Sequence, residues 1–149
     1  MKVTIMNRYI VLLCAGVLFT STAFSFSPKK DKRPQAVEES FRKKFPDAQK
    51  VKWEKEKTEY EASFVLNGVQ TSANFTVNGE WKETESTVSV SDLPKNVSDG
   101  ILSAYPAAKI INAAKIETTE KGVQYEADIK NGKKKLEVLF DTDGKEVKK

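Results

Sequence analysis

The sequence contains two copies of one pattern, spaced about 60 residues apart. Residues 37–48 carry a large apolar side chain at every fourth position and an aromatic-proline pair near the end, and residues 97–108 repeat this arrangement. Farther along, the Tyr-Glu-Ala triplet at 60–62 returns at 125–127. A unit of this size buries little apolar surface alone, so we expect the two copies to pack together around a shared core.

Each copy is predicted to begin with a helix, because its apolar residues recur at helical spacing. These stripes consist of Val37, Phe41 and Phe45 in the first copy and of Val97, Ile101 and Tyr105 in the second. Pro46 and Pro106 should end the helices, since a proline disfavours helical geometry in the preceding residue. Asp92 is placed to cap the second helix, with Pro94 in its first turn. Gly100 inside that helix costs about 1 kcal/mol relative to alanine.

Alternating polar and apolar runs, separated by hairpin dipeptides, follow each helix. Asn-Gly or Asp-Gly occurs at 67–68, 78–79, 131–132 and 143–144, and such a pair between alternating runs is a strong hairpin signal. The expected strands are 51–56, 60–66, 69–77 and 81–90 in the first copy, and 110–119 with strands around 131–132 and after 143–144 in the second. We therefore predict an α+β fold, a tandem αββββ repeat whose antiparallel sheet has the helices on one face.

Alternation divides the strand residues between a face covered by the helices and a face open to solvent. Phe64, Phe75, Ile129 and Phe140 are expected in the core, and Trp53 should pack with them. The open face supplies the candidate partner-binding residues. These are Glu61, Ser63, Gln70, Ser72, Asn74, Gln124, Glu126 and Asp128. Trp81 is expected either to pack across the sheet or to stand at the margin of the open face, where it would anchor a partner.

Residues 1–23 have the three-part pattern of a secretory signal peptide, with cleavage expected after Ala23 or, as second choice, after Ser25. The apolar run is shorter than the roughly 20 residues that span a bilayer, so the mature form should contain no transmembrane span. Cys14 could mark a lipoprotein, but Leu13 precedes it where a small residue is needed. We expect 24–34 to be a linker, 35–90 the first repeat and 91–149 the second.

Several functional classes are excluded or weakened by composition. The chain has no histidine and one cysteine, which excludes histidine-based triads, histidine metal ligands and an internal disulfide. Its net charge of +4 is too small for a nucleic-acid-binding footprint. No cofactor or metal site is predicted, and the protein is not expected to be an enzyme.

Three local patterns leave an alternative reading open. Residues 141–146 could begin a calcium loop, although an ordinary hairpin is favoured. Lys130 and the lysines at 133–135 could bind anions, although a solvated hairpin tip that discourages sheet aggregation is favoured. Glutamates on the strands could form a pair for glycoside hydrolysis, but acid catalysis requires a closed apolar pocket. These glutamates are Glu54, Glu56, Glu59, Glu61, Glu83 and Glu85.

A family resemblance rests on short motifs that together cover most of the chain beyond the signal segment. They are Phe45-Pro46-Asp47-Ala48, Val51-Lys52-Trp53-Glu54, Tyr60-Glu61-Ala62, Val77-Asn78-Gly79-Glu80-Trp81, Tyr105-Pro106-Ala107-Ala108 and Phe140-Asp141-Thr142-Asp143-Gly144. With these motifs the sequence resembles the PepSY-like, putative beta-lactamase-inhibitor-like family, small secreted or periplasmic proteins of Bacteroidetes. The resemblance implies the tandem fold of beta-lactamase inhibitor proteins, which bind their target through the open face of the sheet.

These observations favour a periplasmic or secreted, non-catalytic module that binds a protein or peptide of the cell envelope through the open sheet face. An inhibitor-like role is implied by the resemblance alone. The alternative is a periplasmic carrier of a small ligand or cell-wall fragment, which would need an apolar pocket between sheet and helices. Nucleic acid is not an expected partner.

Overall fold

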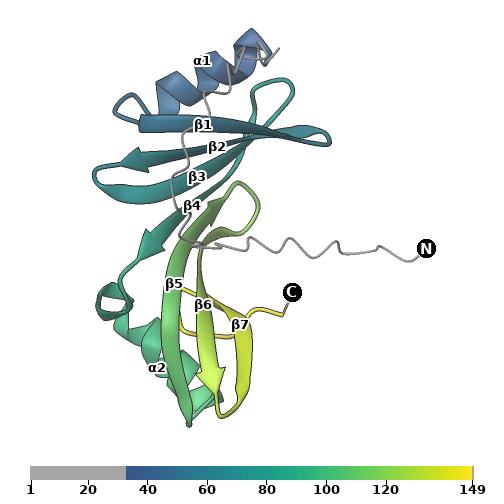
Figure 1. The fold of residues 1–149 in the computed structure, drawn as a ribbon. Coiled ribbons are helices and arrows are strands. Elements are labelled where there is room, and N and C mark those ends of the chain that lie inside the picture. Colours follow the sequence, from purple (N-terminus) through teal and green to yellow (C-terminus); the bar gives the residue numbers. More distant parts are fainter. Residues whose placement is uncertain (1–32, 149) are drawn as a thin grey trace, which may run out of the picture. The chain divides into compact units, whose positions relative to one another are not determined.

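The structure, a computed structural model, describes residues 33–148 (Figure 1). The expected signal peptide, its cleavage sites and most of the expected linker lie outside the described residues. The elements in chain order are α1 (Gln35–Lys44), β1 (Gln49–Glu56), β2 (Glu59–Leu66), β3 (Val69–Thr76), β4 (Trp81–Val88), η1 (Val90–Asp92), α2 (Lys95–Ala104), β5 (Ala108–Thr118), β6 (Gly122–Asn131) and β7 (Lys134–Asp141). Among the described residues, no helix is long and apolar enough to cross a membrane.

The seven strands form one antiparallel sheet in the order of the chain, from β1 to β7. Each strand after β1 therefore pairs with the strand that precedes it. The β2–β3 turn has positive φ angles at both Asn67 (52°) and Gly68 (83°), as a tight hairpin between twisted strands requires. The predicted α+β fold with an antiparallel sheet is confirmed.

The second copy has three strands rather than the expected four. After the turn at Asp143-Gly144, the chain pairs with β7 only through an isolated bridge between Phe140 and Glu146. The Val147 amide also donates to the Leu139 carbonyl oxygen at 2.7 Å. The segment beyond the turn thus covers part of the β7 edge without extending the sheet by a full strand.

The two helices end before an aromatic-proline pair, as expected, and each begins directly after a proline. The predicted cap at Asp92 is wrong, because α2 begins at Lys95 and its N-cap residue is Pro94, which makes no side-chain capping bond. Asp92 instead ends η1, where its amide donates to the Ser89 carbonyl oxygen. The extra turn moves Asp92 away from the first amides of α2.

Both helices cover the same face of the sheet, as predicted. Direct partners in an antiparallel ladder share a face, so the face can be followed from strand to strand. Ala73, in the core under α1, pairs with Thr84 on β4. Val88 lies four residues farther along β4, on the same face as Thr84, and pairs with Ala113 in the core under α2. Figure 1 shows α1 along the β1–β3 part of the sheet and α2 along the β5–β7 part.

The buried apolar residues form two clusters, one beneath each helix, instead of the single shared core that we expected. The expected core residues Phe64, Phe75, Ile129 and Phe140 are all buried. Between the clusters, the helix-side face of β4 and β5 carries polar side chains, including the direct pairs Thr84–Glu117 and Ser86–Lys115. The two copies are therefore joined by strand pairing, and each helix packs on its own half of the sheet.

Glycines let each helix approach a hairpin turn closely. A Cβ atom on Gly79 would lie 2.4 Å from the Ala36 carbonyl oxygen in α1, and one on Gly144 would lie 2.1 Å from the Asn96 carbonyl oxygen in α2. Gly100 faces Gly144 in the same way, with 2.2 Å from its would-be Cβ to the Gly144 oxygen. The glycine inside α2, unfavourable for the isolated helix, is thus required by the packing of α2 against the last turn.

Candidate functional site

The face of the sheet opposite the helices holds eight of the nine candidate residues. Glu61 and Ser63 lie on β2, and the other six follow on β3 and β6. The six are Gln70, Ser72, Asn74, Gln124, Glu126 and Asp128. The register aligns Glu61, Asn74 and Glu83 in one row across β2, β3 and β4, and places Ser63, Ser72 and Glu85 in the next row. The pairing thus brings polar side chains of β2, β3 and β4 together in rows on one face of the sheet.

Several of these residues are much less exposed than an open face would suggest. Asn74 is only 5% exposed and Gln124 only 7%, and Leu139 on the same face is 9% exposed. Ser63 and Gln70, nearer the ends of their strands, are exposed as expected. Because α1 and α2 both pack on the other face, neither helix accounts for this burial.

Of the two placements expected for Trp81, the structure shows packing against the sheet core and not a position at the margin of the open face. Trp81 pairs with Phe75 and packs against the core under α1. Its indole nitrogen donates to the Thr84 hydroxyl at 2.9 Å, and the Lys44 ammonium lies 3.8 Å from the ring centroid. A β-bulge in the β3–β4 ladder is the reason. The consecutive residues Asn74 and Phe75 pair with Glu83 and Trp81, so Lys82 is an extra residue on β4, and Trp81 and Glu83 face opposite sides of the sheet.

Glu83 and Glu85 lie on the open face, where alternation from an outward-facing Trp81 also places them, although they were not among the candidate binding residues. Counting alternate residues from Trp81 keeps all three side chains on one side, and only the bulge separates the tryptophan from the glutamates. A bulge of this kind leaves no distinct signal in the sequence of β4. Alternation alone therefore could not show that Trp81 leaves the open face, and the register adds the two glutamates to the candidates of that face.

Glu85 is the most perturbed acid of this face. Burial raises the pKa of its carboxyl group from 4.5 to about 7, and the negative charges of Glu126, Glu83, Glu61 and Glu137 add to the shift. These four residues come from β6, β4, β2 and β7, so carboxylates of four strands converge on one position. A raised pKa of this kind is common at binding and catalytic sites, but also arises from crowding of charges.

The arrangement offers little support for glycoside hydrolysis. Glu54 and Glu56 lie exposed on the edge strand β1, and Glu59 is half-buried at the β1–β2 turn. Glu85 has the raised pKa that a general acid needs, yet it lines neither of the two best-formed pockets of the described residues. In the part of the chain that the structure describes, neither pocket encloses a carboxylate pair of this face, as that chemistry requires.

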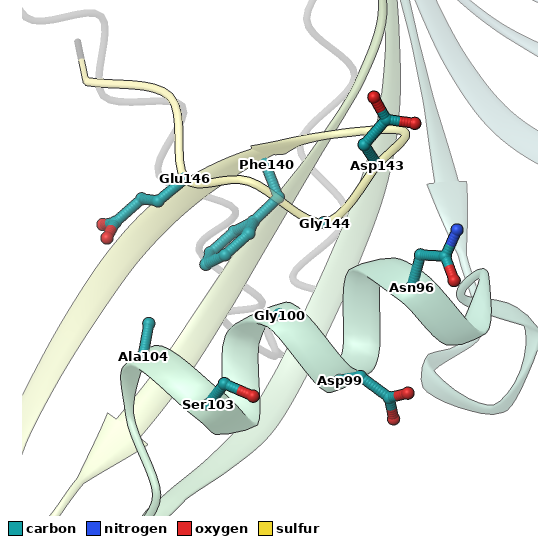
Figure 2. A pocket seen from close by; sticks show the side chains of 9 residues that line it. All are labelled: Asn96, Asp99, Gly100, Ser103, Ala104, Phe140, Asp143, Gly144 and Glu146. Carbon is teal, nitrogen blue, oxygen red and sulfur yellow. The ribbon is translucent and has the colours of Figure 1, made fainter.

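The larger of those pockets, of about 560 Å³, lies between α2 and the last turn (Figure 2). Its lining is formed mostly by polar side chains and glycine backbone, with Phe140 as the large apolar residue. The lining residues are Asn96, Asp99, Gly100, Ser103, Ala104, Phe140, Asp143, Gly144 and Glu146. The smaller pocket, of about 290 Å³, lies beside α1 and includes Arg33 and Trp53. Neither is the apolar cavity between sheet and helices that a carrier of small ligands would need.

The remaining sequence patterns have ordinary structural roles. The Asp141 carboxylate accepts hydrogen bonds from the amides of Asp143 and Lys145, both at 2.9 Å, which stabilises the turn as a hairpin. Within residues 33–148, no group of three acidic side chains is arranged to hold a metal ion. Lysines 133–135 lie exposed at the β6–β7 tip. Trp53 packs against the core as predicted, with its ring centroid 5.0 Å from that of Phe41.

Comparison with solved structures identifies relatives of the same fold. A BLIP-like protein from Bacteroides fragilis is 25% identical, with a TM-score of 0.70 over 77% of this chain and 84% of that one. A DUF2874 family protein from Bacteroides ovatus is 24% identical (TM-score 0.72; 79% and 86% covered), and a putative periplasmic protein from Bacteroides eggerthii is 23% identical (TM-score 0.70; 77% and 86% covered). The prediction of a periplasmic or secreted protein agrees with the last description.

A search of curated proteins finds no match to this sequence. The family described as putative beta-lactamase-inhibitor-like, PepSY-like matches twice, over residues 26–65 and 59–148. The two matches cover both helix-and-strand copies and nearly all of the described residues. The chain therefore belongs to the PepSY-like, putative beta-lactamase-inhibitor-like family.

Proposed function

We propose that this protein is a periplasmic or secreted, non-catalytic module that binds a protein or peptide through the face of the sheet opposite its helices. One observation carries the proposal. Both helices cover the same face, while the other face presents a continuous polar surface across β2 to β7 in which Glu61, Ser72 and Glu126 are only half-buried. An exposed sheet surface that no described helix covers is available to a partner without any cost in folding.

The comparisons support the location and the mode of binding. The similar structure from B. eggerthii is described as periplasmic, and residues 1–23 of this chain have the pattern of a signal peptide. The similar structure from B. fragilis is described as BLIP-like. By analogy of fold, an inhibitor-like use of the same sheet face is the form of binding that we favour.

A matched pair of serine-to-arginine substitutions tests the proposal. Ser72→Arg places a long charged side chain in the middle of the open face, and Ser103→Arg places the same side chain on the exposed surface of α2. Immobilised protein is used to capture partners from an envelope extract of the source bacterium. We expect Ser72→Arg to abolish capture and Ser103→Arg to leave it intact, with melting temperatures close to that of the wild type.

The reverse pattern would contradict the proposal. Loss of capture with Ser103→Arg and not with Ser72→Arg would assign binding to the helical face and make the sheet a scaffold. Equal capture by all three proteins would show that neither surface is involved.

A further inference from the structure

The middle of the open face gathers five glutamates. This acidic cluster is formed by Glu61 on β2, Glu83 and Glu85 on β4, Glu126 on β6 and Glu137 on β7. The four outer glutamates all raise the pKa of Glu85, which shows that their charges act on one place. Lysines of the same face lie toward its borders, with Lys52 opposite Ser63 at the β1 edge and Lys130 paired with Lys135 near the β6–β7 tip.

Asn74 lies at the middle of this cluster and is incompletely satisfied. The register pairs it directly with Glu61 on one side and Glu83 on the other. Its side chain is 95% buried, and its Oδ1 atom has no hydrogen-bond partner. A buried amide oxygen without a donor costs about 1–3 kcal/mol, so native proteins rarely retain one without a compensating role.

The neighbours of Asn74 explain why the oxygen lacks a donor. Ionised carboxylates only accept hydrogen bonds, so Glu61 and Glu83 can take the hydrogens of the Asn74 amide but cannot give one to its oxygen. A donor for Oδ1 therefore has to come from a different group. A lysine ammonium or an arginine guanidinium carries several hydrogens and a positive charge, so one such group can donate to Oδ1 and pair with the carboxylates at the same time.

We propose that the acidic cluster around Asn74 binds a lysine or arginine side chain of a protein or peptide partner. This inference rests on the proposed function and adds the chemistry of the partner to it. The partner inserts a basic side chain between Glu61 and Glu83, with the Asn74 oxygen as its neutral acceptor and Glu85 as its counter-charge from the next row. Neither α1 nor α2 obstructs the approach, and the side chains that cover the Asn74 oxygen move aside when the cation enters.

Charge complementarity favours a basic side chain over a bare metal ion. No three acidic side chains in the described part of the chain are arranged to surround a metal. In the row Glu61, Asn74 and Glu83, hydrogen-bond acceptors lie on three adjacent strands. A planar guanidinium or an ammonium with three donors can bind several such acceptors at once. The face thus suits an organic cation that is presented on a chain.

The first test measures binding of a six-residue arginine peptide to the purified protein by isothermal calorimetry in about 0.15 M salt. The control peptide replaces arginine with citrulline, which keeps the shape and removes the charge. Glu83→Gln combined with Glu85→Gln should weaken arginine-peptide binding at least tenfold. The matched control, Glu39→Gln with Asp99→Asn, removes two charges from the exposed helical surfaces and should change affinity less than twofold.

The second test separates the asparagine from the surrounding charge. Asn74→Leu keeps every carboxylate and removes the orphaned oxygen, so we expect several-fold weaker peptide binding. The melting temperature should stay the same or rise, because a buried polar atom without a partner has been removed. Weaker binding by a protein that is no less stable cannot be explained by damage to the fold.

Several outcomes would overturn the inference. Equal loss of affinity in the helical-surface control would show that net charge alone attracts the peptide. Equal binding of the citrulline peptide would show that no cation is recognised, and displacement of the arginine peptide by millimolar Ca²⁺ at constant ionic strength would favour a metal site. If Ser72→Arg abolishes partner capture while the Glu83 and Glu85 substitutions leave capture unchanged, the proposed function holds and the inferred partner chemistry is wrong.

Discussion

Glu85 makes the stability of the protein depend on pH in a direction opposite to that of most carboxylates. Its pKa is about 7 in the folded protein and near 4.5 in the unfolded chain, so between these values the folded state holds a proton that the unfolded state has lost. The free energy of unfolding contributed by this group therefore falls as pH rises from about 4.5 to 7 and is constant above that. The cause is the cost of ionising a half-buried carboxyl group beside four glutamates.

Glu85→Gln should remove this dependence. Glutamine has the same shape and stays neutral, so we expect the variant to melt at a higher temperature than the wild type at pH 8 and at a similar temperature at pH 5. Thermal denaturation followed by circular dichroism at the two pH values measures the effect. Glu39→Gln on the exposed surface of α1 should show no such difference. If the Glu85→Gln protein were less stable than the wild type at pH 8, burial and neighbouring negative charge could not be what raises the pKa of Glu85.

Gly100 lowers the stability of the isolated α2 helix but is needed for the stability of the folded protein. Replacing a glycine inside a helix with alanine normally stabilises by roughly 1 kcal/mol. Here the added Cβ would meet the Gly144 carbonyl oxygen at 2.2 Å, and both atoms belong to backbones that can move only together with α2 or the last turn. We expect Gly100→Ala to destabilise by about 1–3 kcal/mol in urea denaturation.

Ser103→Ala is the matched control for this prediction, since Ser103 lies exposed on the same helix. It should be neutral or slightly stabilising. A Gly100→Ala protein that is more stable than the wild type would mean that α2 and the last turn are farther apart than the structure shows.

At the scale of single elements, Trp81 belongs to the packing of α1 on the sheet. Its ring contacts the Lys44 ammonium near the end of α1 and hydrogen-bonds Thr84 on its own strand. Trp81→Ala should therefore lower stability by about 2 kcal/mol, less than the roughly 3–5 kcal/mol of a fully buried aromatic residue. Partner capture by the folded variant should be unchanged. Trp81→Phe, which keeps most of the contact with α1, should recover much of the stability.

The elements themselves could be predicted from local signals, because each depends on few residues. Helical spacing ended by an aromatic-proline pair defined α1 and α2, and the Asn67-Gly68 pair defined the β2–β3 hairpin with both residues in the required left-handed region. Alternation then placed Phe64 and Phe75 in the core. These signals are short-range, so one sequence carries them in full.

The β-bulge next to Trp81 could not be predicted from such short-range signals. It depends on how β3 and β4 pair across the turn between them, and alternation within β4 carries no record of it. A one-residue shift puts the side chains before and after it on opposite faces, so Trp81 packs under α1 while Glu83 and Glu85 lie on the open face. The Asn74 oxygen lacks a donor because of the residues paired with it on both neighbouring strands. The centre of the candidate site could therefore be identified only once the strand register was known.

On the scale of the whole molecule, the two copies share a sheet and keep separate cores. The ladder between β4 and β5 runs from the Glu83–Thr118 pair to the Val88–Ala113 pair. Without the second copy, β4 would become an unpaired edge, and a unit of about 60 residues would have to fold on its own core. A fragment ending at Ser91 should therefore be largely unfolded, as judged by circular dichroism.

The intact chain allows a sharper test of this coupling, because both of its tryptophans, Trp53 and Trp81, lie in the first copy. Phe140→Ala empties a fully buried site in the second core and should cost about 3–5 kcal/mol. If strand pairing makes the two copies unfold as one, tryptophan fluorescence and far-ultraviolet circular dichroism should report the same lowered midpoint in urea. This result would be informative because the substitution lies in the second cluster, whereas both tryptophans pack against the first. A fluorescence midpoint that stays at the wild-type value while the circular dichroism transition splits would show that the β4–β5 ladder joins two independently folding units.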